Sequence, residues 1–311
     1  MVARRWAIVA RGSECRYFRY MARRPGTLLL AALWCVVAFL ALLAVAYGSS
    51  GARSLDARAL HGFVDLRSVS VEGRVSWVAA FGNPLQVGVM AALLTGVALV
   101  RGRPRLALSV VALIGLSSIS SQFLKEALAY PRFGGMVDGV QIAPAAFPSG
   151  HATAAMSIAL ALVLVVPTRA RPLAAVLGLV FALAVSLCVV ALGSHFPSDI
   201  VGGFLLATFW TLVVAAALAA TSSRWPERTG RTRLTASLQR AADWTTTAGT
   251  AALAAMVLGV LALVGAALVF SRFADLVSFA GQRTSLVAVF VAIAVAAAAV
   301  VGGVTVALRR S

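Results

Sequence analysis

Charged and polar side chains are scarce in this sequence. Of its 311 residues only 10 are acidic, 3 are histidine and 3 are cysteine, and the 27 basic residues include a single lysine, Lys125. The cysteines, Cys15, Cys35 and Cys188, suggest neither a disulfide framework nor a metal cluster. Hydrophobic residues make up 61% of the chain, whereas soluble domains are about half apolar. The composition therefore predicts an integral membrane protein.

Apolar runs of about 20 residues recur along the chain, and a helix needs that length to cross a hydrocarbon core. A membrane β-barrel would show short alternating segments instead. We expect an all-α, polytopic membrane helical bundle with eight spans, at 26–48, 78–100, 104–124, 151–167, 173–193, 198–220, 248–270 and 285–307. The first six form a core over 26–220 and the last two form a C-terminal hairpin over 248–311. Residues 1–25 are a basic cytoplasmic N-terminus, and 221–247 form a cytoplasmic linker.

The arginines predict the orientation of these spans. They cluster before the first span, after the last one, and in the connections that follow the second, fourth and sixth. If every span crosses, all these segments lie on one side, which the positive-inside rule makes the cytoplasm. Both termini are then cytoplasmic. Because all basic residues except Lys125 are arginine, a bias typical of a GC-rich bacterial genome, we expect the inner membrane of a bacterium. The formal charge of +17 reflects this topology and contact with lipid headgroups, and without interleaved aromatic residues it does not indicate nucleic-acid binding.

Residues 54–68 fall on the opposite side and predict a short amphipathic helix in the membrane interface. The apolar residues recur at helical spacing with charges between them: Leu55, Ala59, Phe63 and Leu66. His61 within this segment is interpreted as an ordinary interfacial residue.

Three polar clusters interrupt the apolar chain, and the topology places all of them on the extracytoplasmic side. The first cluster contains Lys125 and Arg132, seven residues apart at the end of the third span. Two cations at a membrane surface suit an anion such as phosphate, whose oxygens accept hydrogen bonds from both. The alternative is a pair that only marks the membrane boundary, although such flanking cations prefer the cytoplasmic side.

The second cluster, Pro148-Ser149-Gly150-His151, opens the fourth span. A helix N-terminus offers unpaired N–H groups, Gly150 lets an anion approach the backbone, and Ser149 adds a hydroxyl donor. His151 can act as a proton donor near neutral pH. The alternative is a plain helix cap by Ser149, which does not account for the histidine.

The third cluster lies between Gly193 and Gly203 and contains His195, Pro197 and Asp199. Pro197 suits the first position of a new helix. Asp199 in the first turn can accept the Nδ1–H of His195 and leave Nε2 free as a nucleophile. The alternative is that Asp199 only caps the sixth span.

At these residues the chain resembles the type 2 phosphatidic acid phosphatase superfamily. The family pattern is a lysine, six residues and Arg-Pro, then Pro-Ser-Gly-His, then Ser-Arg, five residues, His, three residues and Asp. Lys125 and Arg132 have the first spacing, residues 148–151 match the second motif, and His195 and Asp199 match the end of the third. The stretch 79–90 also looks like the family's second span, so the resemblance covers roughly residues 25–220.

The sequence departs from the family pattern at two places. Phe133 replaces the proline after Arg132, which implies a mild change in loop shape. Val189 stands where the third motif has a phosphate-contacting arginine, next to Cys188 in place of serine. Losing such a charge-assisted hydrogen bond costs about 1.5–3 kcal/mol of phosphate binding, on the order of 10–100-fold. Two arginines of the loop 271–284 on the same side are candidates to supply the missing cation, or else simply bind lipid headgroups: Arg272 and Arg283.

The resemblance implies metal-independent hydrolysis of a phosphate monoester or diphosphate. In this scheme His195 attacks phosphorus and forms a phosphohistidine, Asp199 stabilises the imidazole, and His151 protonates the leaving oxygen. The phosphoryl oxygens are held by four residues: Lys125, Arg132, Ser149 and Gly150. No carboxylate cluster suggests magnesium or zinc, so we expect no metal and no cofactor. The expected substrate is a lipid phosphate, and phosphatidic acid, phosphatidylglycerol phosphate and polyprenyl phosphate or pyrophosphate are all compatible.

Two other functions remain open at this point. The loss of the third-motif arginine at Val189 favours a weakly active or inactive scaffold that binds lipid phosphates, although pure binding needs no nucleophile. A phosphotransferase that passes phosphate from a polyprenyl carrier to an envelope lipid or glycan would share the first half-reaction. A transporter is less well supported, because the spans carry little charge along a path. The last two spans lie outside the family core and could contact a second copy or another envelope enzyme.

Overall fold

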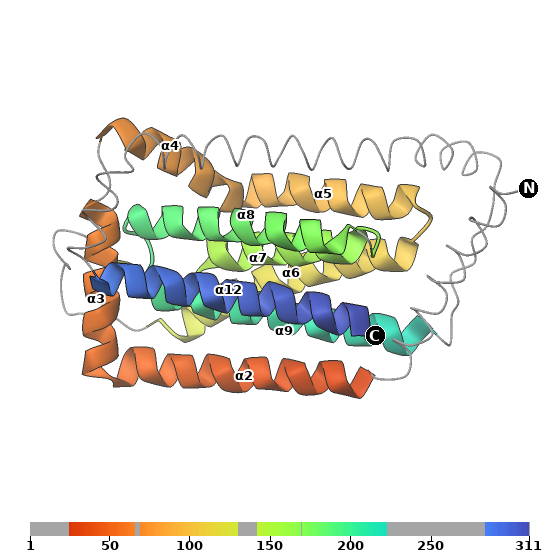
Figure 1. Ribbon diagram of the computed structural model, residues 1–311, viewed down its shortest axis with the longest axis horizontal. Coiled ribbons are helices and arrows are strands. Elements are labelled where there is room, and N and C mark those ends of the chain that lie inside the picture. Colours follow the sequence, from red (N-terminus) through yellow and green to blue (C-terminus); the bar gives the residue numbers. More distant parts are fainter. Residues whose placement is uncertain (1–24, 66–68, 130–141, 169, 223–283, 311) are drawn as a thin grey trace, which may run out of the picture.

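The computed structural model describes residues 25–65, 69–129, 142–168, 170–222 and 284–310, and the regular elements in these ranges are helices. Four of them are long and apolar enough to cross a membrane: α2 (Pro25–Gly48), α6 (Pro104–Ala127), α8 (Arg171–Ala191) and α9 (Pro197–Ser222). They run side by side with α5, α7 and α12 in one bundle (Figure 1). The expected all-α membrane bundle is confirmed, and six expected spans correspond to α2, α6, α7, α8, α9 and α12 to within a few residues. The span at 248–270, the linker and the basic N-terminus lie outside the described residues.

The second expected span, 78–100, is not one helix. The chain forms α4 (Val69–Ala79), a 3₁₀ turn at Ala80–Gly82 and then α5 (Pro84–Val100), and the axis bends by 53° at the break. Proline has no N–H and disfavours a helical conformation in the residue before it, so Pro84 starts a new helix and leaves Asn83 extended, at φ −72° and ψ 153°. The prediction missed this break because residues 78–100 are apolar on both sides of it.

Helix α3 (Ser50–Asp65) lies across one end of the bundle, as expected for an interfacial helix (Figure 1). Its buried side includes Ala59, Leu60 and Phe63, and it packs on α8, α9 and α12. Leu55 of the expected apolar stripe is instead 41% exposed, because the buried side is centred on residues 59, 60 and 63.

Helix α7 (Gly150–Val165) occupies the centre of the bundle, where it contacts α5, α6, α8 and α9. All of its residues are buried except Gly150, His151 and Leu162. Small residues let the neighbouring helices come close: a Cβ on Gly178 of α8 would lie 2.8 Å from the Cβ of Ala159, and one on Gly203 of α9 would lie 2.8 Å from the carbonyl oxygen of Ser149. These two crossings fix α7 tightly against α8 and α9.

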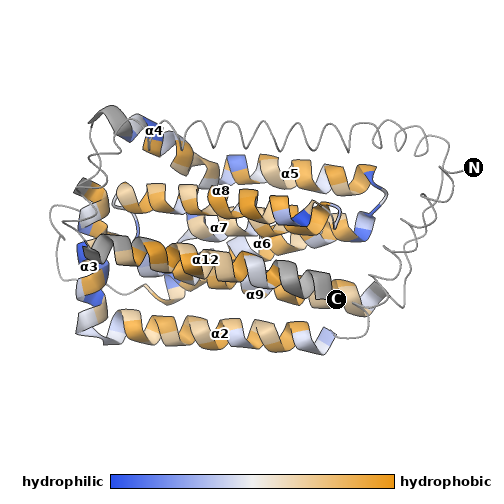
Figure 2. Cartoon of the chain, viewed as in Figure 1, coloured by the Kyte–Doolittle hydropathy of each residue, from blue (hydrophilic) through white to orange (hydrophobic). Residues whose placement is uncertain are grey.

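The two ends of the bundle differ in charge. The polar connection between α5 and α6, which contains Arg101 and Arg103, lies at the end opposite α3, and Arg105 follows it in the first turn of α6 (Figure 2). Arg101 there donates to the carbonyl oxygen of Val165 at 2.6 Å, and Arg105 donates to the Thr221 hydroxyl. Helix α12 (Thr284–Arg310) packs on α8, α9 and α3 and also ends at this side (Figure 1). The arginines of the α5–α6 connection therefore lie at the end opposite α3, and the α3 end holds the polar clusters described next.

Candidate functional site

The three polar clusters meet at the α3 end of the bundle. Lys125 lies in the last turn of α6, His151 in the first turn of α7, and His195 just before α9 begins at Pro197. The three clusters lie together because α6 ends, and α7 and α9 begin, at the same end of the bundle (Figure 1). A direct bond joins the second and third clusters, since the Ser149 N–H donates to the Asp199 carbonyl oxygen at 3.0 Å.

Ser149 caps helix α7. Its backbone is extended and its hydroxyl oxygen accepts from the Ala152 N–H at 3.3 Å, while its carbonyl accepts from the Thr153 hydroxyl at 2.8 Å. The side chain is completely buried. The capping interpretation of Ser149 thus has direct support, and a role toward phosphate stays a prediction.

Asp199 contacts both the N-terminus of α9 and the imidazole of His195. It is the third residue of α9, and its Oδ2 accepts the Phe196 N–H at 2.8 Å, which satisfies a donor at the start of the helix. The same oxygen lies 3.5 Å from His195 Nδ1. Asp199 is 0% exposed and His195 is 6% exposed, so the carboxylate acts where little solvent screens it. The cap is thus a hydrogen bond, whereas the approach to His195 Nδ1 is too long for one, and the role of Asp199 as the partner of His195 stays a prediction.

The two imidazoles lie close together at the start of α7, in an edge-to-face arrangement. The ring centroids of His151 and His195 lie 6.5 Å apart, with 61° between the ring planes. Lys125 belongs to the same group, because a Cβ on Gly150 would lie 3.3 Å from Lys125 Nζ. The ammonium therefore sits against the N-terminus of α7, where backbone N–H groups also favour an anion.

Two residues that the sequence analysis did not select hold this arrangement. Asp56 of α3 accepts from the Ser198 N–H at 3.2 Å and from the Ser198 hydroxyl at 2.5 Å, which ties the crossing helix to the start of α9. Asn83 Oδ1 lies 3.0 Å from His151 Nε2. The Asn-Pro pair at 83–84 is a turn signal that could have drawn attention to Asn83. Asp56 had only its position in an amphipathic segment to mark it.

Val189 is buried in the apolar core of the bundle, with 2% of its surface exposed. It lies in the last turn of α8, and its carbonyl oxygen accepts from the Ser194 N–H at 3.1 Å. Three predicted cations, Arg132, Arg272 and Arg283, lie outside the described residues. Among the described residues no group of three or more His, Cys, Asp or Glu side chains could hold a metal ion.

Comparisons with known proteins agree with the motifs. Residues 106–223 match the model of the PAP2 superfamily, and this segment contains all three polar clusters. The fold is similar to the crystal structure of the first transmembrane PAP2 type phosphatidylglycerolphosphate phosphatase from Bacillus subtilis, with a TM-score of 0.50 and 22% sequence identity. That similarity covers 64% of this chain and 98% of the Bacillus chain. No curated protein matches the sequence. The resemblance inferred from the motifs is confirmed, as is the membrane-embedded helical fold.

Proposed function

We propose that this chain, whose residues 106–223 match the PAP2 superfamily, is an integral membrane lipid phosphatase. It would hydrolyse a lipid phosphate or a polyprenyl pyrophosphate at the extracytoplasmic face through a phosphohistidine. The observation that carries the proposal is the pair of imidazoles 6.5 Å apart, one of them beside a fully buried carboxylate. A binding site alone would need neither a nucleophile nor a proton donor.

In the first step His195 is the nucleophile. Its Nδ1 faces Asp199, so Nε2 is the ring nitrogen that attacks phosphorus. The N–P bond forms as the bond between phosphorus and the leaving oxygen breaks, and His151 gives that oxygen a proton. Asp199 stabilises the positive charge that the phosphorylated ring acquires. In the second step water attacks phosphorus, His151 takes a proton from it, and the N–P bond breaks to release phosphate.

Lys125 and the start of α7 bind the phosphoryl oxygens in this scheme. The Lys125 ammonium lies against Gly150, where a side chain would fill the space beside it. Phosphoryl transfer depends mostly on positioning and on charge stabilisation, which a cation and a helix N-terminus supply. Arg132 and Ser149 complete the proposed set of phosphate ligands.

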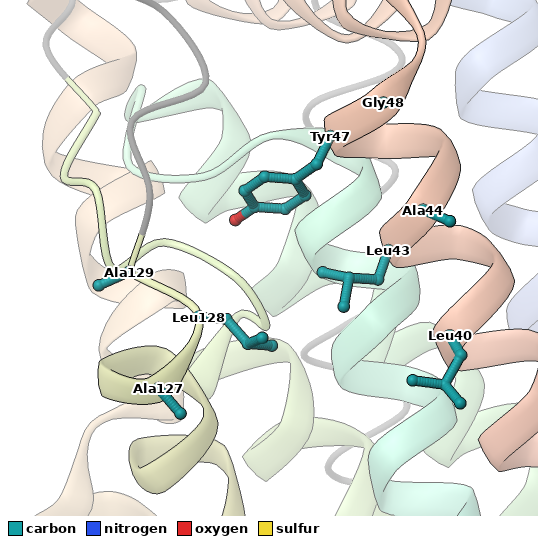
Figure 3. Close-up of a pocket in the computed structure, with 8 residues that line it drawn as sticks. All are labelled: Leu40, Leu43, Ala44, Tyr47, Gly48, Ala127, Leu128 and Ala129. Carbon is teal, nitrogen blue, oxygen red and sulfur yellow. The ribbon is translucent and has the colours of Figure 1, made fainter.

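An open cavity with mostly apolar lining, next to the end of α6 that carries Lys125, supports a lipid substrate. It has a volume of about 690 Å³ and lies between α2 and the end of α6 (Figure 3). Its lining residues are Leu40, Leu43, Ala44, Tyr47, Gly48, Ala127, Leu128 and Ala129. Ala127 is two residues beyond Lys125, and the Tyr47 ring packs edge-on against Phe147, just before the Pro148–His151 motif. A phosphate bound at Lys125 could therefore place its hydrocarbon chain in this cavity.

The test is phosphate release by the purified full chain in nanodiscs. The panel would contain phosphatidic acid, polyprenyl pyrophosphate and phosphatidylglycerol phosphate, the last because the similar Bacillus protein is named for it. We expect His195→Ala to lose about 10³-fold or more of the activity and to form no acid-labile phosphoenzyme. His61→Ala, which changes an exposed histidine of α3, is the matched control and should keep full activity. Release by His195→Ala at the wild-type rate would refute the proposal.

The proposed face can be tested separately. The described connection between α5 and α6, with Arg101 and Arg103, lies at the end opposite the imidazoles, which supports an extracytoplasmic site by the positive-inside rule. Intact spheroplasts that contain the protein should hydrolyse a membrane-impermeant phosphate ester without lysis. Activity that appears only after lysis would place the site in the cytoplasm.

Val189 favours a second candidate, a lipid-phosphate-binding protein with little turnover. Its apolar side chain is buried where the family resemblance implies a phosphate-contacting arginine. Binding of a fluorescent lipid phosphate, measured beside phosphate release, separates the two functions. Tight binding without release, unchanged in His195→Ala, would favour the binding protein.

A further inference from the structure

The break between the 3₁₀ turn and α5 places an asparagine next to a predicted catalytic histidine. Asn83, the only asparagine of the sequence, is the N-cap residue of α5, a position where asparagine usually accepts a hydrogen bond from the first turn. Its side chain makes no such cap here. Instead Oδ1 lies 3.0 Å from Nε2 of His151, which is 68 residues further along the chain. The side chain therefore gives up a stabilising local bond for a contact with the imidazole.

Gly82 forms the surface against which the imidazole of His151 packs. A Cβ on Gly82 would lie 2.5 Å from Cδ2 of His151 and 2.9 Å from both its Cβ and its Cγ. Contacts this short cannot occur, so only glycine lets the ring lie against the backbone at this position. The Cγ–Cδ2 edge thus rests on Gly82 with Nε2 at Asn83, and the Nδ1–Cε1 edge is turned away from Gly82.

We propose that Asn83 is a positioning residue for His151, which fixes the ring orientation and keeps a proton on Nε2. This inference rests on the proposed function, in which His151 is the general acid. Because the carbonyl oxygen of Asn83 accepts Nε2–H, the proton that His151 transfers is the one on Nδ1. In the transfer the Nδ1–H bond breaks and an O–H bond forms on the leaving oxygen, which takes the electrons of the P–O bond. The ring therefore starts as an imidazolium with a proton on both nitrogens, and it becomes neutral with its Nε2–H still bonded to Asn83.

The dependence on the leaving group tests this role. An alkyl phosphate needs a proton on its leaving oxygen, whereas an aryl phosphate such as p-nitrophenyl phosphate releases a stable anion without one. In Asn83→Leu we expect kcat for a lipid monophosphate to fall by about 10–100-fold, with KM changed by less than about 2-fold, because general acid catalysis contributes about 10²–10⁴-fold. The rate with the aryl ester should fall by less than about 3-fold. Gln86→Leu, which removes an amide from the same helix, is the matched control and should leave both rates unchanged.

Asn83→Asp keeps an acceptor at the same place and adds a charge. Its activity should be close to that of the wild type, and the basic limb of its pH–rate profile should move to higher pH, because a carboxylate stabilises the imidazolium. The other titratable groups that face His151 are His195 and Lys125, and both are unchanged in this variant. If Asn83→Leu does not fold, the pH–rate profile of Asn83→Asp tests the inference by itself. A basic limb at the same pH as in the wild type would overturn it.

Equal losses with both substrates in Asn83→Leu would mean that Asn83 serves only to hold the fold. If the wild-type protein releases no phosphate from either ester, the proposed function fails, and the bond to Asn83 can still be examined without turnover. ¹⁵N NMR of histidine-labelled protein, with His151 assigned from His151→Ala, should show the Nε2–H tautomer in the wild type and a mixture in Asn83→Leu. The same mixture in both proteins would overturn the role of Asn83.

Discussion

Asp199→Asn separates the two roles of this carboxylate. One oxygen, Oδ2, accepts the Phe196 N–H at 2.8 Å and lies 3.5 Å from His195 Nδ1. An asparagine whose amide oxygen takes this place keeps the acceptor for the Phe196 N–H and an oxygen beside His195 Nδ1, and it removes only the charge. The bond to Phe196 changes from a charged one worth about 1.5–3 kcal/mol to a neutral one worth about 0.5–1.5 kcal/mol. We therefore expect a loss of about 1–1.5 kcal/mol of stability, a decrease of a few degrees in the unfolding temperature.

In Asp199→Asn the loss of transition-state stabilisation should be larger than the loss of folding stability. Without the charge nothing in this contact stabilises the imidazole of His195 when it becomes positive, and the comparable change in a serine-protease triad costs about 10⁴-fold. We expect a loss of about 10²–10⁴-fold in kcat for Asp199→Asn. The measurements are phosphate release and thermal unfolding in the same detergent. Asp199→Ala, which also leaves the buried Phe196 N–H unpaired, should cost a further 1–3 kcal/mol or so of stability.

Asp56→Asn is the matched control, because Asp56 is an acid that also accepts hydrogen bonds at the start of α9 but lies on another helix. It should lower the unfolding temperature by a similar amount and kcat by less than about 10-fold. If Asp199→Asn keeps its activity within about 3-fold while its stability falls as in the control, the carboxylate is only a helix cap. The phosphohistidine scheme would then lose the partner of its nucleophile.

Three further predictions concern the surroundings of the site. Asp56→Ala removes both bonds to Ser198, so the unfolding temperature should fall further than in Asp56→Asn, as differential scanning calorimetry would detect. Gly203→Ala should lower the free energy of unfolding by about 1–3 kcal/mol, because the new Cβ would lie 2.8 Å from the Ser149 carbonyl oxygen. The control Gly88→Ala, whose Cβ would have no atom within 4 Å, should be neutral or stabilising. Equal unfolding temperatures for the two variants would contradict the close crossing of α7 and α9. Val189→Arg should raise kcat/KM by about 10-fold and lower the unfolding temperature, because it adds a cation at a buried position. The control Val189→Met should lower the unfolding temperature without raising kcat/KM. A loss of activity in Val189→Arg would mean that the site requires an apolar side chain at this position.

The sequence predicted most of the bundle because each span is a long apolar run with polar ends. Helix α6, expected at 104–124, extends over Pro104–Ala127, and α9, expected at 198–220, extends over Pro197–Ser222. The break at Gly82–Pro84 was missed because apolar residues lie on both sides of it, so hydropathy alone does not detect it. The local signal for the break is the turn-forming sequence Gly82-Asn83-Pro84.

The sequence predicted the contacts that arise within one short stretch, and the chemical roles of these residues stay predictions. His195 and Asp199 are four residues apart, and Ser149 and His151 flank one glycine, so each pair is close because of its spacing alone. Asn83 and Asp56 were missed because their partners lie 68 and 142 residues away along the chain. Such contacts arise when the helices pack, and neither partner carries a local pattern that indicates the other.

The shortness of α7 decides how deep the chemistry takes place. Its 16 residues span about 24 Å, whereas the 24 residues of α2 or α6 span about 36 Å and a bilayer's hydrocarbon core is about 30 Å thick. Arg101 binds the carbonyl of Val165, which ties the last turn of α7 to the start of the α5–α6 connection. We therefore expect the first turn of α7, with His151, to lie deeper in the bundle than the ends of α2 and α6 on that side. If the chain is the lipid phosphatase proposed above, its turnover should depend on the thickness of the surrounding bilayer, because a headgroup must move inward to reach His151.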